Sequence, residues 1–409
     1  MLRFLLQISQ EGGLISLDIR KRAEELEAEV IELRRWLHQH AEVSWQEYES
    51  TEYIIAYLEK LGLEVHRYEG HTGCWTMIRG GRAGDGGKTI LLRADFDALP
   101  ITEETGLSFA SIHKGVFHGC GHETHAAMLL VACKMLVELQ NELTGNVKVL
   151  FQAAEETANG AKYYVDQGIL DHVDAVYGCH ISTWIDSPYI SVNGGPRTAA
   201  TDEFAIRIQG VGCHGGMPHQ GRDAIVAVCS TVMNLQTVVS RLTDPIDALV
   251  VTVGKIDGGA NYNVVADTAT LSGTVRSYSR EVRAGVPGKL RQVAEHTAAA
   301  HGCTAQVEYE MKTGPVIHSD PQMMRISHDA VVKLFGEEAL LETRPIGGGD
   351  DFAYFSERVP GIYAMIGAAM PSDDGLVHAH HHPKVCFDEG SLKRGVAMHV
   401  QMAVDFLGE

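Results

Sequence analysis

The stretch His118-Gly-Cys-Gly-His-Glu-Thr-His125 places three imidazoles, one thiol and one carboxylate close together in the chain. Neutral histidine and thiolate cysteine are the usual ligands of a divalent cation such as zinc. The two glycines permit tight turns, so Cys120 and His122 can point at one centre. A helical run of apolar residues, 126–133, follows directly. The stretch therefore predicts a metal-binding loop that leads into a buried helix, with ordinary packed or solvated residues as the alternative.

The composition narrows the class of protein. A length of 409 residues favours two or three domains, and an apolar content of 45% is enough to form a core. The net charge of −19 argues against a nucleic-acid partner, because phosphate backbones require clustered Lys and Arg. No apolar run reaches the roughly 18–20 residues that span a membrane. Residues 1–8 lack the long apolar core of a signal peptide, so we expect a loosely ordered extension there.

Eight cysteines are scattered along the chain without a regular spacing, at positions 74, 120, 133, 179, 213, 229, 303 and 386. A chain of this length does not need disulfides, so we expect free thiols and a cytoplasmic location. The apolar surroundings of Cys133 and Cys229 predict that both are buried. A thiol-redox enzyme built on Cys120 is disfavoured, because the sequence contains no Cys-x-x-Cys.

The N-terminal part of the chain, from Ser16 to about Lys60, has the apolar periodicity of helices. His38 and His40 lie at the end of the first of these helices. We expect them to be surface or packing residues rather than parts of a site.

Three short apolar strands that follow carry ligand-type residues at their ends. Ligands of open α/β sheets bind at the carboxyl ends of the strands. The two neighbouring glutamates could divide the work, one holding a metal and the other moving protons, because their side chains take different directions. The two aspartates have turn capping as an alternative role. The strands and the residues that follow them are 89–92 with Asp95 and Asp97, 147–151 with Glu155 and Glu156, and 175–178 with His180.

The character of the sequence changes near residue 196. Alternating segments and two amphipathic helices follow in a β-α-β-β-α-β order, which predicts a small antiparallel sheet with helices on one face. From about residue 321 helical segments and wholly apolar strands return. The glycine loop Gly347–Gly349 could bind a carboxylate through its N–H groups, and it is no phosphate loop because no Gly-Lys-Ser/Thr follows. A histidine run, residues 378–382, precedes Pro383.

Six motifs in this order resemble the amidohydrolase branch of the M20 metallopeptidase family, which includes hippurate hydrolases, N-acyl-amino-acid amidohydrolases and auxin-conjugate hydrolases. The resemblance extends from about Arg34 to the C-terminus. The motifs are Leu92-Arg-Ala-Asp-Phe-Asp-Ala-Leu-Pro-Ile101, His118-Gly-Cys-Gly-His122, Phe151-Gln-Ala-Ala-Glu-Glu156, His214-Gly-Gly-Met-Pro-His219, Gly347-Gly-Gly-Asp-Asp-Phe-Ala-Tyr354 and His381-His-Pro383.

The resemblance implies an α/β fold: a mixed sheet flanked by helices, as in zinc peptidases, with an inserted α+β, ferredoxin-like satellite domain that often dimerises. Carried onto this chain, the catalytic domain comprises residues 1–198 and 313–409, and the satellite or lid domain comprises residues 199–312. We therefore expect a homodimer or a higher homo-oligomer.

The resemblance also implies two divalent metal ions, Zn, Mn, Co or Ni. The implied ligands are Cys120, His122, Glu156, His180 and one histidine of the 380–382 run. His381 fits the family pattern of His, any residue, Pro, while His380 and His382 stay open. His122 cannot chelate two metals as an aspartate can, so one tight and one weak site are expected.

Two positions depart from the family pattern. Glu123 stands where the family usually has Asp, one methylene longer, and this change could alter metal affinity if the acid orients a ligand. Phe96 stands where Met is usual, which we expect to affect packing or the pocket wall.

The implied reaction is hydrolysis of an N-acyl amino acid to a carboxylic acid and a free amino acid. Glu155 would act as the general base, and Asp97, with Asp95, would support the metal site. His214 would stabilise the oxyanion from the satellite domain of the same chain or of a second subunit. Arg276, Asn263 and Gly348 of the glycine loop would hold the substrate carboxylate, with a surface role as the alternative for Arg276. Cleavage of small dipeptides and a non-catalytic metal-binding scaffold are the competing functions.

Overall fold

The computed structural model describes residues 16–84 and 86–409. The chain forms two compact units, which we call the main unit and the satellite unit. The main unit contains residues 16–194, His318–Thr343 and Tyr354–Glu409, and the satellite unit contains Gly195–Ile317 and Arg344–Ala353. The extension expected over residues 1–8 lies outside the described residues.

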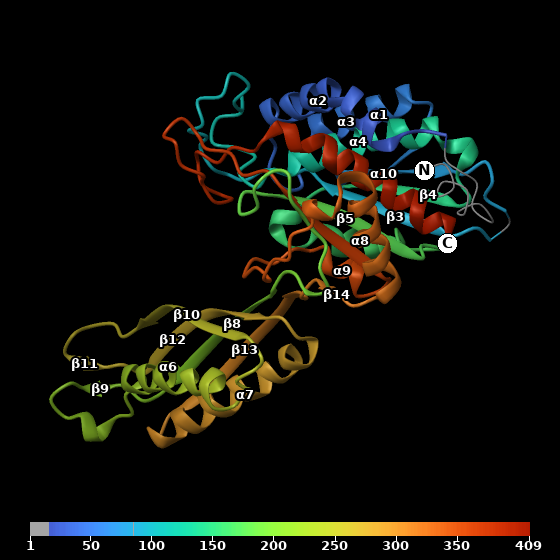
Figure 1. Ribbon diagram of the computed structural model, residues 1–409. Helices are drawn as coiled ribbons and strands as arrows, with labels where there is room; N and C mark the ends of the chain where they lie inside the picture. The colour runs from blue at the N-terminus through green and yellow to red at the C-terminus, as the bar shows by residue number, and fades with distance from the viewer. Residues whose placement is uncertain (1–15, 85) are drawn as a thin grey trace. The chain divides into compact units, whose positions relative to one another are not determined.

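A seven-stranded mixed sheet forms the centre of the main unit (Figure 1). β3, β4, β5 and β15 run parallel, while β1, β2 and β6 join antiparallel at the two sides. β3, β4 and β15 are buried almost throughout, as expected for central strands covered on both faces. In spatial order the strands are β1 (Val65–Arg67), β2 (Cys74–Arg79), β4 (Asn146–Gln152), β3 (Thr89–Asp95), β5 (Ala175–Ser182), β15 (Gly361–Gly367) and β6 (Ile190–Ser191).

Helices gather densely on one side of this sheet, shown above it in Figure 1. α4 and α10 pack against β3 and β5, and α1 and α2 pack outside them. α4 is buried along nearly its whole length, which agrees with the apolar run that begins at Ala126. The helices are α1 (Ile19–Glu25), α2 (Glu27–Gln39), α3 (Tyr48–Lys60), α4 (His122–Glu138), α5 (Gly160–Asp166), α8 (Pro321–Phe335), α9 (Ala353–Ser356) and α10 (Leu392–Gly408).

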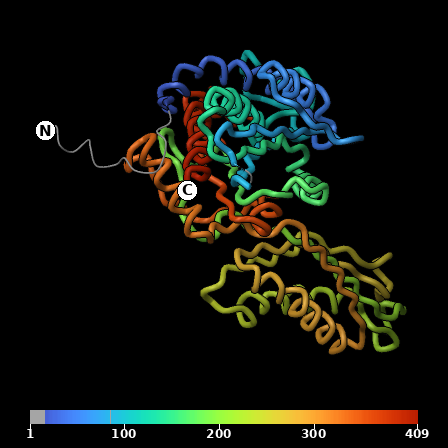
Figure 2. The backbone as a smooth tube through the Cα atoms, turned by 90° about the vertical axis from the view of Figure 1, so that its right-hand side faces the viewer, coloured from blue at the N-terminus to red at the C-terminus, as the bar shows by residue number. Residues whose placement is uncertain are grey.

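The satellite unit is a four-stranded antiparallel sheet with two helices on one face (Figure 2). Alternate residues of β8 are buried, and Phe204, Ile206 and Ile208 join the core beneath the helices. The strands, in spatial order, are β10 (Leu249–Gly258), β12 (Thr268–Ser277), β8 (Ala200–Gln209) and β13 (Thr304–Thr313), and the helices are α6 (Ala224–Ser240) and α7 (Arg280–Ala300). Two small pairs complete the strands: β9 (Cys213–His214) with β11 (Val264–Val265), and β7 (Gly195–Pro196) with β14 (Ile317–His318).

The structure differs from the sequence prediction in the extent of α7 and in the second domain boundary. α7 begins at Arg280, ten residues before the predicted start, because Ser279 caps it and Val286 packs in the core despite Pro287. Residues 344–353 belong to the satellite unit. The sequence analysis had assigned all residues from 313 to 409 to the catalytic domain. The amide of Ile346 donates to Arg197 O, and that of Ala199 donates to Gly348 O, each over 2.9 Å. These backbone bonds between distant segments carry no local sequence signal.

All eight cysteines are free thiols. Cys133 is buried as predicted, but the prediction for Cys229 was wrong. The Cys229 side chain is exposed because it lies on α6 one position beyond the buried Ala227 and Val228, on the side that faces away from the core. Among the described helices, none is both long enough and apolar enough to cross a bilayer.

Candidate metal centre and active site

The loop before α4 makes a turn that only glycine fits. Gly121 has φ +86°, and a Cβ there would lie 2.6 Å from Ile181 Cγ2. This close approach brings the start of α4 against β5. Cys120 and His122, on either side of the glycine, therefore meet His180 of β5.

Cys120, His122 and His180 form a compact group of ligand atoms. Cys120 Sγ lies 3.5 Å from His180 Nε2. His180 donates through Nδ1 to the carbonyl of Ile181, which leaves Nε2 as the nitrogen that faces the cluster. Burial lowers the pKa of His180 well below its ordinary value and keeps the imidazole in the neutral form that binds metals.

Asp97 connects three parts of the site. Its Oδ1 accepts from His122 Nδ1 over 3.2 Å, so His122 Nε2 is directed to the cluster. Its Oδ2 accepts from the Ser44 hydroxyl over 2.7 Å and from the Glu156 amide over 3.0 Å. Burial is the largest influence on the pKa of Asp97 and raises it, but the charge and hydrogen bond of His122 together with the bonds from Ser44 and the Glu156 amide outweigh burial, so the pKa of Asp97 is lowered. The Asp97 carboxylate thus orients two candidate ligands: it binds the imidazole ring of His122 and the backbone amide of Glu156.

Glu155 and Glu156 begin a short 3-10 helix, Glu155–Thr157, at the end of β4. An oxygen of each carboxylate lies 4.0 Å from His122 Nε2. The two side chains therefore face the same imidazole. The sequence analysis predicted that they would point in different directions, and that prediction was wrong. An extended strand would have separated them, and the 3-10 turn brings them together. Burial and the neighbouring charge of Asp97 raise the pKa of Glu156 to about 7.

The three histidines of the 380–382 run have different surroundings. His381 Nε2 lies 3.6 Å from Glu156 Oε1. His380 is engaged at both nitrogens, donating to Cys120 O and accepting from the Thr183 amide. His382 stacks on His378 and accepts from the Lys384 amide. The geometry therefore favours His381 as the ligand from this segment.

The cluster suits divalent cations. His122 Nε2 and Glu156 Oε1 are buried and have no hydrogen-bond partner among the described residues. Buried polar atoms normally have a partner, so this is expected of atoms that bind a cation. Ligand atoms about 2.0–2.3 Å from a shared metal lie roughly 3.3–3.8 Å apart, close to the separations observed here. Cys120 belongs to two overlapping groups, one with His122 and His180 and one with Glu156 and His381. The sequence prediction did not consider that one thiol would belong to both groups of candidate ligands.

A second polar network, formed by His125, Asp95 and Arg93, lies next to the cluster of candidate ligands. His125 donates through Nδ1 to Asp95 Oδ1, and its Nε2 accepts from the Ile181 amide. Arg93 pairs with the same aspartate. Both nitrogens of His125 are therefore engaged, and Asp95 contacts β5 through His125. A sequence signal existed for this position, because His125 stands one helical turn after His122.

Glu123 points away from the candidate metal ligands. Its Oε1 accepts from Arg34 Nε over 3.0 Å and from His38 Nδ1 over 2.9 Å, and its Oε2 lies 3.7 Å from His118 Nδ1. These groups are all buried. The long glutamate therefore ties α4 to α2 and does not contact a ligand directly. His38 belongs to this buried ion network, which the sequence prediction did not foresee.

The other predicted site residues lie in the satellite unit. His214 and Asn263 are neighbours there, since β9 pairs with β11 and the Gly215 amide donates to Asn263 O. Arg276 lies on β12, and its Nη1 donates to Val275 O. Gly348 accepts from the Ala199 amide. The structure therefore brings His214 and Asn263 together and leaves Arg276 and Gly348 on other segments.

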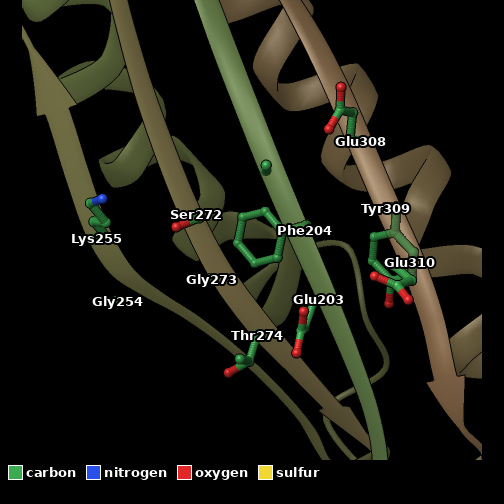
Figure 3. Close-up of a pocket in the computed structure, with 11 residues that line it drawn as sticks. Glu203, Phe204, Gly254, Lys255, Ser272, Gly273, Thr274, Glu308, Tyr309 and Glu310 are labelled. Atoms are coloured by element: carbon green, nitrogen blue, oxygen red, sulfur yellow. The ribbon is translucent and has the colours of Figure 1, made fainter. Parts of the chain in front are cut away.

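A shallow groove on the satellite sheet does not resemble this centre (Figure 3). Three glutamates and one lysine, Glu203, Glu308, Glu310 and Lys255, line it together with small residues such as Ser272 and Thr274. No histidine or cysteine is among its described lining residues. The candidate metal ligands therefore lie in the cluster of the main unit and not along this groove.

Comparison with known proteins agrees with this geometry. A family model described as Peptidase family M20/M25/M40 matches residues 91–405. The chain belongs to this family. An N-acetyl-L-cysteine deacetylase of Bacillus subtilis (strain 168) is 39% identical over 90% of this chain and 85% of its own length. Thermostable carboxypeptidase 1 of Saccharolobus solfataricus is 33% identical over 95% of this chain and 98% of its own.

A solved structure gives the same architecture. The Bacillus subtilis YXEP protein, described as a dinuclear metal binding peptidase from the M20 family, superposes with a TM-score of 0.83 at 32% identity, covering 94% of this chain and 99% of the other. The fold predicted from the motifs is thereby confirmed, as is the amidohydrolase branch of the M20 family. This M20 chain is a hydrolase of amide bonds, and its cluster fits two divalent cations.

Proposed function

We propose that this M20 hydrolase cleaves N-acyl amino acids to a carboxylic acid and a free amino acid. The observation that carries the proposal is the approach of Glu155 and Glu156 to one imidazole nitrogen, 4.0 Å each, inside a cluster of N, S and O ligand atoms. A metal-binding scaffold has a use for Glu156 but none for a second carboxylate directed at the same point. An amidohydrolase has a use for both.

The metal ligands in this proposal are Cys120, His122, Glu156, His180 and His381. When bound, divalent cations would polarise the substrate carbonyl and acidify the attacking water. Zn, Mn, Co and Ni are all compatible with a mixed N, S and O ligand set. The Glu156 and His381 side is less buried than the His122 side, which supports one weak and one tight site.

Glu155 is assigned the proton transfers. It would take the proton of the attacking water and deliver it to the leaving amine, a role worth about 10²–10⁴-fold in rate. Asp97 would hold His122 in the tautomer that directs Nε2 to the metals.

The satellite unit would supply the substrate contacts. His214 would donate to the developing oxyanion, and Arg276, Asn263 and the Gly348 amide would bind the substrate carboxylate. His214 is exposed, so it is available either to its own chain or to a second copy. A homodimer through the satellite unit is supported by exposed apolar residues on α6 and β10, among them Met233, Val250 and Ile256. Free thiols throughout support a cytoplasmic location.

Cleavage of peptides is the second candidate, favoured by the carboxypeptidase relative. The same cluster could hydrolyse a peptide bond, so the distinction depends on the acyl side of the substrate. The deacetylase relative, which is more similar to this chain than the carboxypeptidase is, favours acyl amino acids.

Exchanging the two glutamates separately tests the proposal. Glu155→Gln should lower kcat by about 10²–10⁴-fold while the protein keeps its metal, because the base is lost and the ligands remain. Glu156→Gln, the matched variant one residue away, should lose metal as well as activity. Metal content by mass spectrometry and release of free amino acid are measured on both. Full turnover by Glu155→Gln would contradict the proposal.

A further inference from the structure

Glu47 is a buried carboxylate that takes no part in the proposed reaction. It precedes α3 and is 0% exposed, yet its side chain does not cap that helix. Its carboxylate instead reaches the segment that carries Glu155 and Glu156. The Ala154 amide donates to Glu47 Oε1 over 2.9 Å, and the Thr72 hydroxyl donates to Oε2 over 2.5 Å.

Ala154 has a backbone conformation that alanine rarely adopts. Its φ of 60° and ψ of 40° lie in the left-handed region, which costs any residue with a Cβ. This left-handed residue follows the end of β4 at Gln152 by two positions and directly precedes the 3-10 helix Glu155–Thr157. The turn is what directs both glutamates to His122. A strained residue at this position must be held by its surroundings.

Two side chains hold consecutive amides of the turn. Tyr164 Oη accepts from the Ala153 amide over 3.1 Å, next to the bond that Glu47 accepts from Ala154. Tyr164 in turn donates to Thr72 O over 2.7 Å, so Thr72 joins the tyrosine to Glu47. Gly73 permits this approach, because a Cβ there would overlap Tyr164 Oη and its φ is +86°. Glu47, Thr72 and Tyr164 thus form one buried bracket around Ala153 and Ala154.

We propose that Glu47 is a positioning residue that holds Ala154 in the left-handed conformation and thereby aims Glu155 and Glu156 at the metal centre. Glu47 acts through the Ala154 amide and touches neither substrate nor metal. The bracket is independent of the protonation state of Glu47, since Oε1 accepts from the amide whether or not Oε2 carries a proton. Activity as a readout rests on the proposed function, but the placement of Glu156 can be read from metal binding alone.

The test compares three substitutions at Glu47. Glu47→Gln keeps an oxygen for the Ala154 amide and a donor for Thr72, and should behave like the unmodified protein. Glu47→Ala removes the acceptor, and Glu47→Asp keeps the charge but is one methylene too short. Both should lower kcat and cobalt affinity by about 10–100-fold, with KM changed less. Glu49→Ala is the control, because Glu49 is an exposed glutamate in the first turn of α3.

A second substitution tests the mechanism directly. Ala154→Gly should restore much of the activity and cobalt affinity to Glu47→Ala and Glu47→Asp, because glycine adopts the left-handed conformation without cost. Ala158→Gly should not, although Ala158 is also left-handed at φ 58°, because its amide donates to Glu155 O and not to Glu47. If Glu47→Ala does not fold, as judged by circular dichroism, Glu47→Asp with and without Ala154→Gly replaces it.

Three results would overturn the inference: Glu47→Gln as impaired as Glu47→Ala, no rescue by Ala154→Gly, or unchanged cobalt affinity and kcat in Glu47→Ala. The absorption of bound cobalt(II) keeps this outcome separate from that of the proposed function. If the unmodified protein hydrolyses no N-acyl amino acid, the cobalt titrations of the same variants still decide whether Glu47 positions Glu156.

Discussion

Burial keeps two histidines near β5, His180 and His399, in the neutral form. His180 is kept neutral by burial, which prepares it as a ligand. His399 of α10 is kept neutral in the same way, although it holds no metal in the proposed centre. Its Nε2 lies 3.4 Å from Cys179 Sγ, and burial lowers its pKa to about 3. Burial thus prepares His180 as a metal ligand, whereas at His399 it makes the folding stability sensitive to acid.

His399 should make folding stability depend on pH. Its pKa is about 3 in the folded chain and about 6.5 in the unfolded chain, so only the unfolded chain binds a proton between these values. Stability from this group is complete above about pH 6.5 and falls as the pH is lowered. Between pH 7 and pH 5 the loss should be ~2 kcal/mol. His399→Leu should remove this part of the pH dependence in urea unfolding of the chelator-treated protein.

His296→Leu is the matched control, because His296 is an exposed histidine on α7. It should leave the pH dependence unchanged. The role given to His399 is contradicted if His399→Leu and the unmodified protein lose equal stability between pH 7 and pH 5.

At the residue level, the sequence was informative where ligands and their turn residues lie close together in the chain. Cys120, Gly121 and His122 are of this kind, and the loop they form is present. The sequence was uninformative where the partner is distant: nothing near Glu47 indicates Ala154, and nothing near Arg34 indicates Glu123. The common orientation of Glu155 and Glu156 was also missed, because it depends on a left-handed residue that is an alanine rather than a glycine.

Among the elements, α2 and α4 are joined by a buried ion pair rather than by apolar packing alone. Arg34 of α2 is 2% exposed and its partner Glu123 is fully buried. The neighbouring Arg35 is 47% exposed and pairs with Glu389 at the surface. Two adjacent arginines therefore sit in opposite environments on one helix.

This contrast predicts unequal effects of the same substitution. Arg34→Met should lower the free energy of unfolding by about 3 kcal/mol or more, because it leaves the Glu123 carboxylate buried with fewer partners. Arg35→Met should change it by less than ~1 kcal/mol, as for most surface pairs. Denaturant unfolding of both variants measures the difference. Equal losses would show that the buried pair does not secure α4.

At the level of elements, periodicity located most helices and strands, since each pattern is local. The predicted α7 was too short, because Gly285, Pro287 and Gly288 suggest a break in the helix. The Ser279 cap and the core packing of Val286 outweigh this local tendency. Periodicity could not reveal sheet order, because β4 lies between β2 and β3 in the sheet, whereas it lies between β3 and β5 in the sequence.

At the level of the whole molecule, the change in sequence pattern near residue 196 indicated an inserted unit. The alternating strands of that unit have one solvated face, unlike the fully buried central strands β3, β4 and β15 of the main unit. The return of residues 344–353 to the satellite unit was not foreseen. This return gives the satellite unit the Gly347–Gly349 loop as well as His214, Asn263 and Arg276. All the proposed substrate contacts thus belong to one unit and all the proposed metal ligands to the other.

The central claim is that this M20 chain is a metal-dependent hydrolase of N-acyl amino acids. The most direct measurement is release of free amino acid from a panel of N-acetyl and N-benzoyl amino acids and dipeptides by protein loaded with Zn, Mn, Co or Ni. We predict release from at least one N-acyl amino acid, its loss with chelator and its return with metal. Protein that carries two metal ions per chain yet releases nothing from any N-acyl amino acid would contradict the claim.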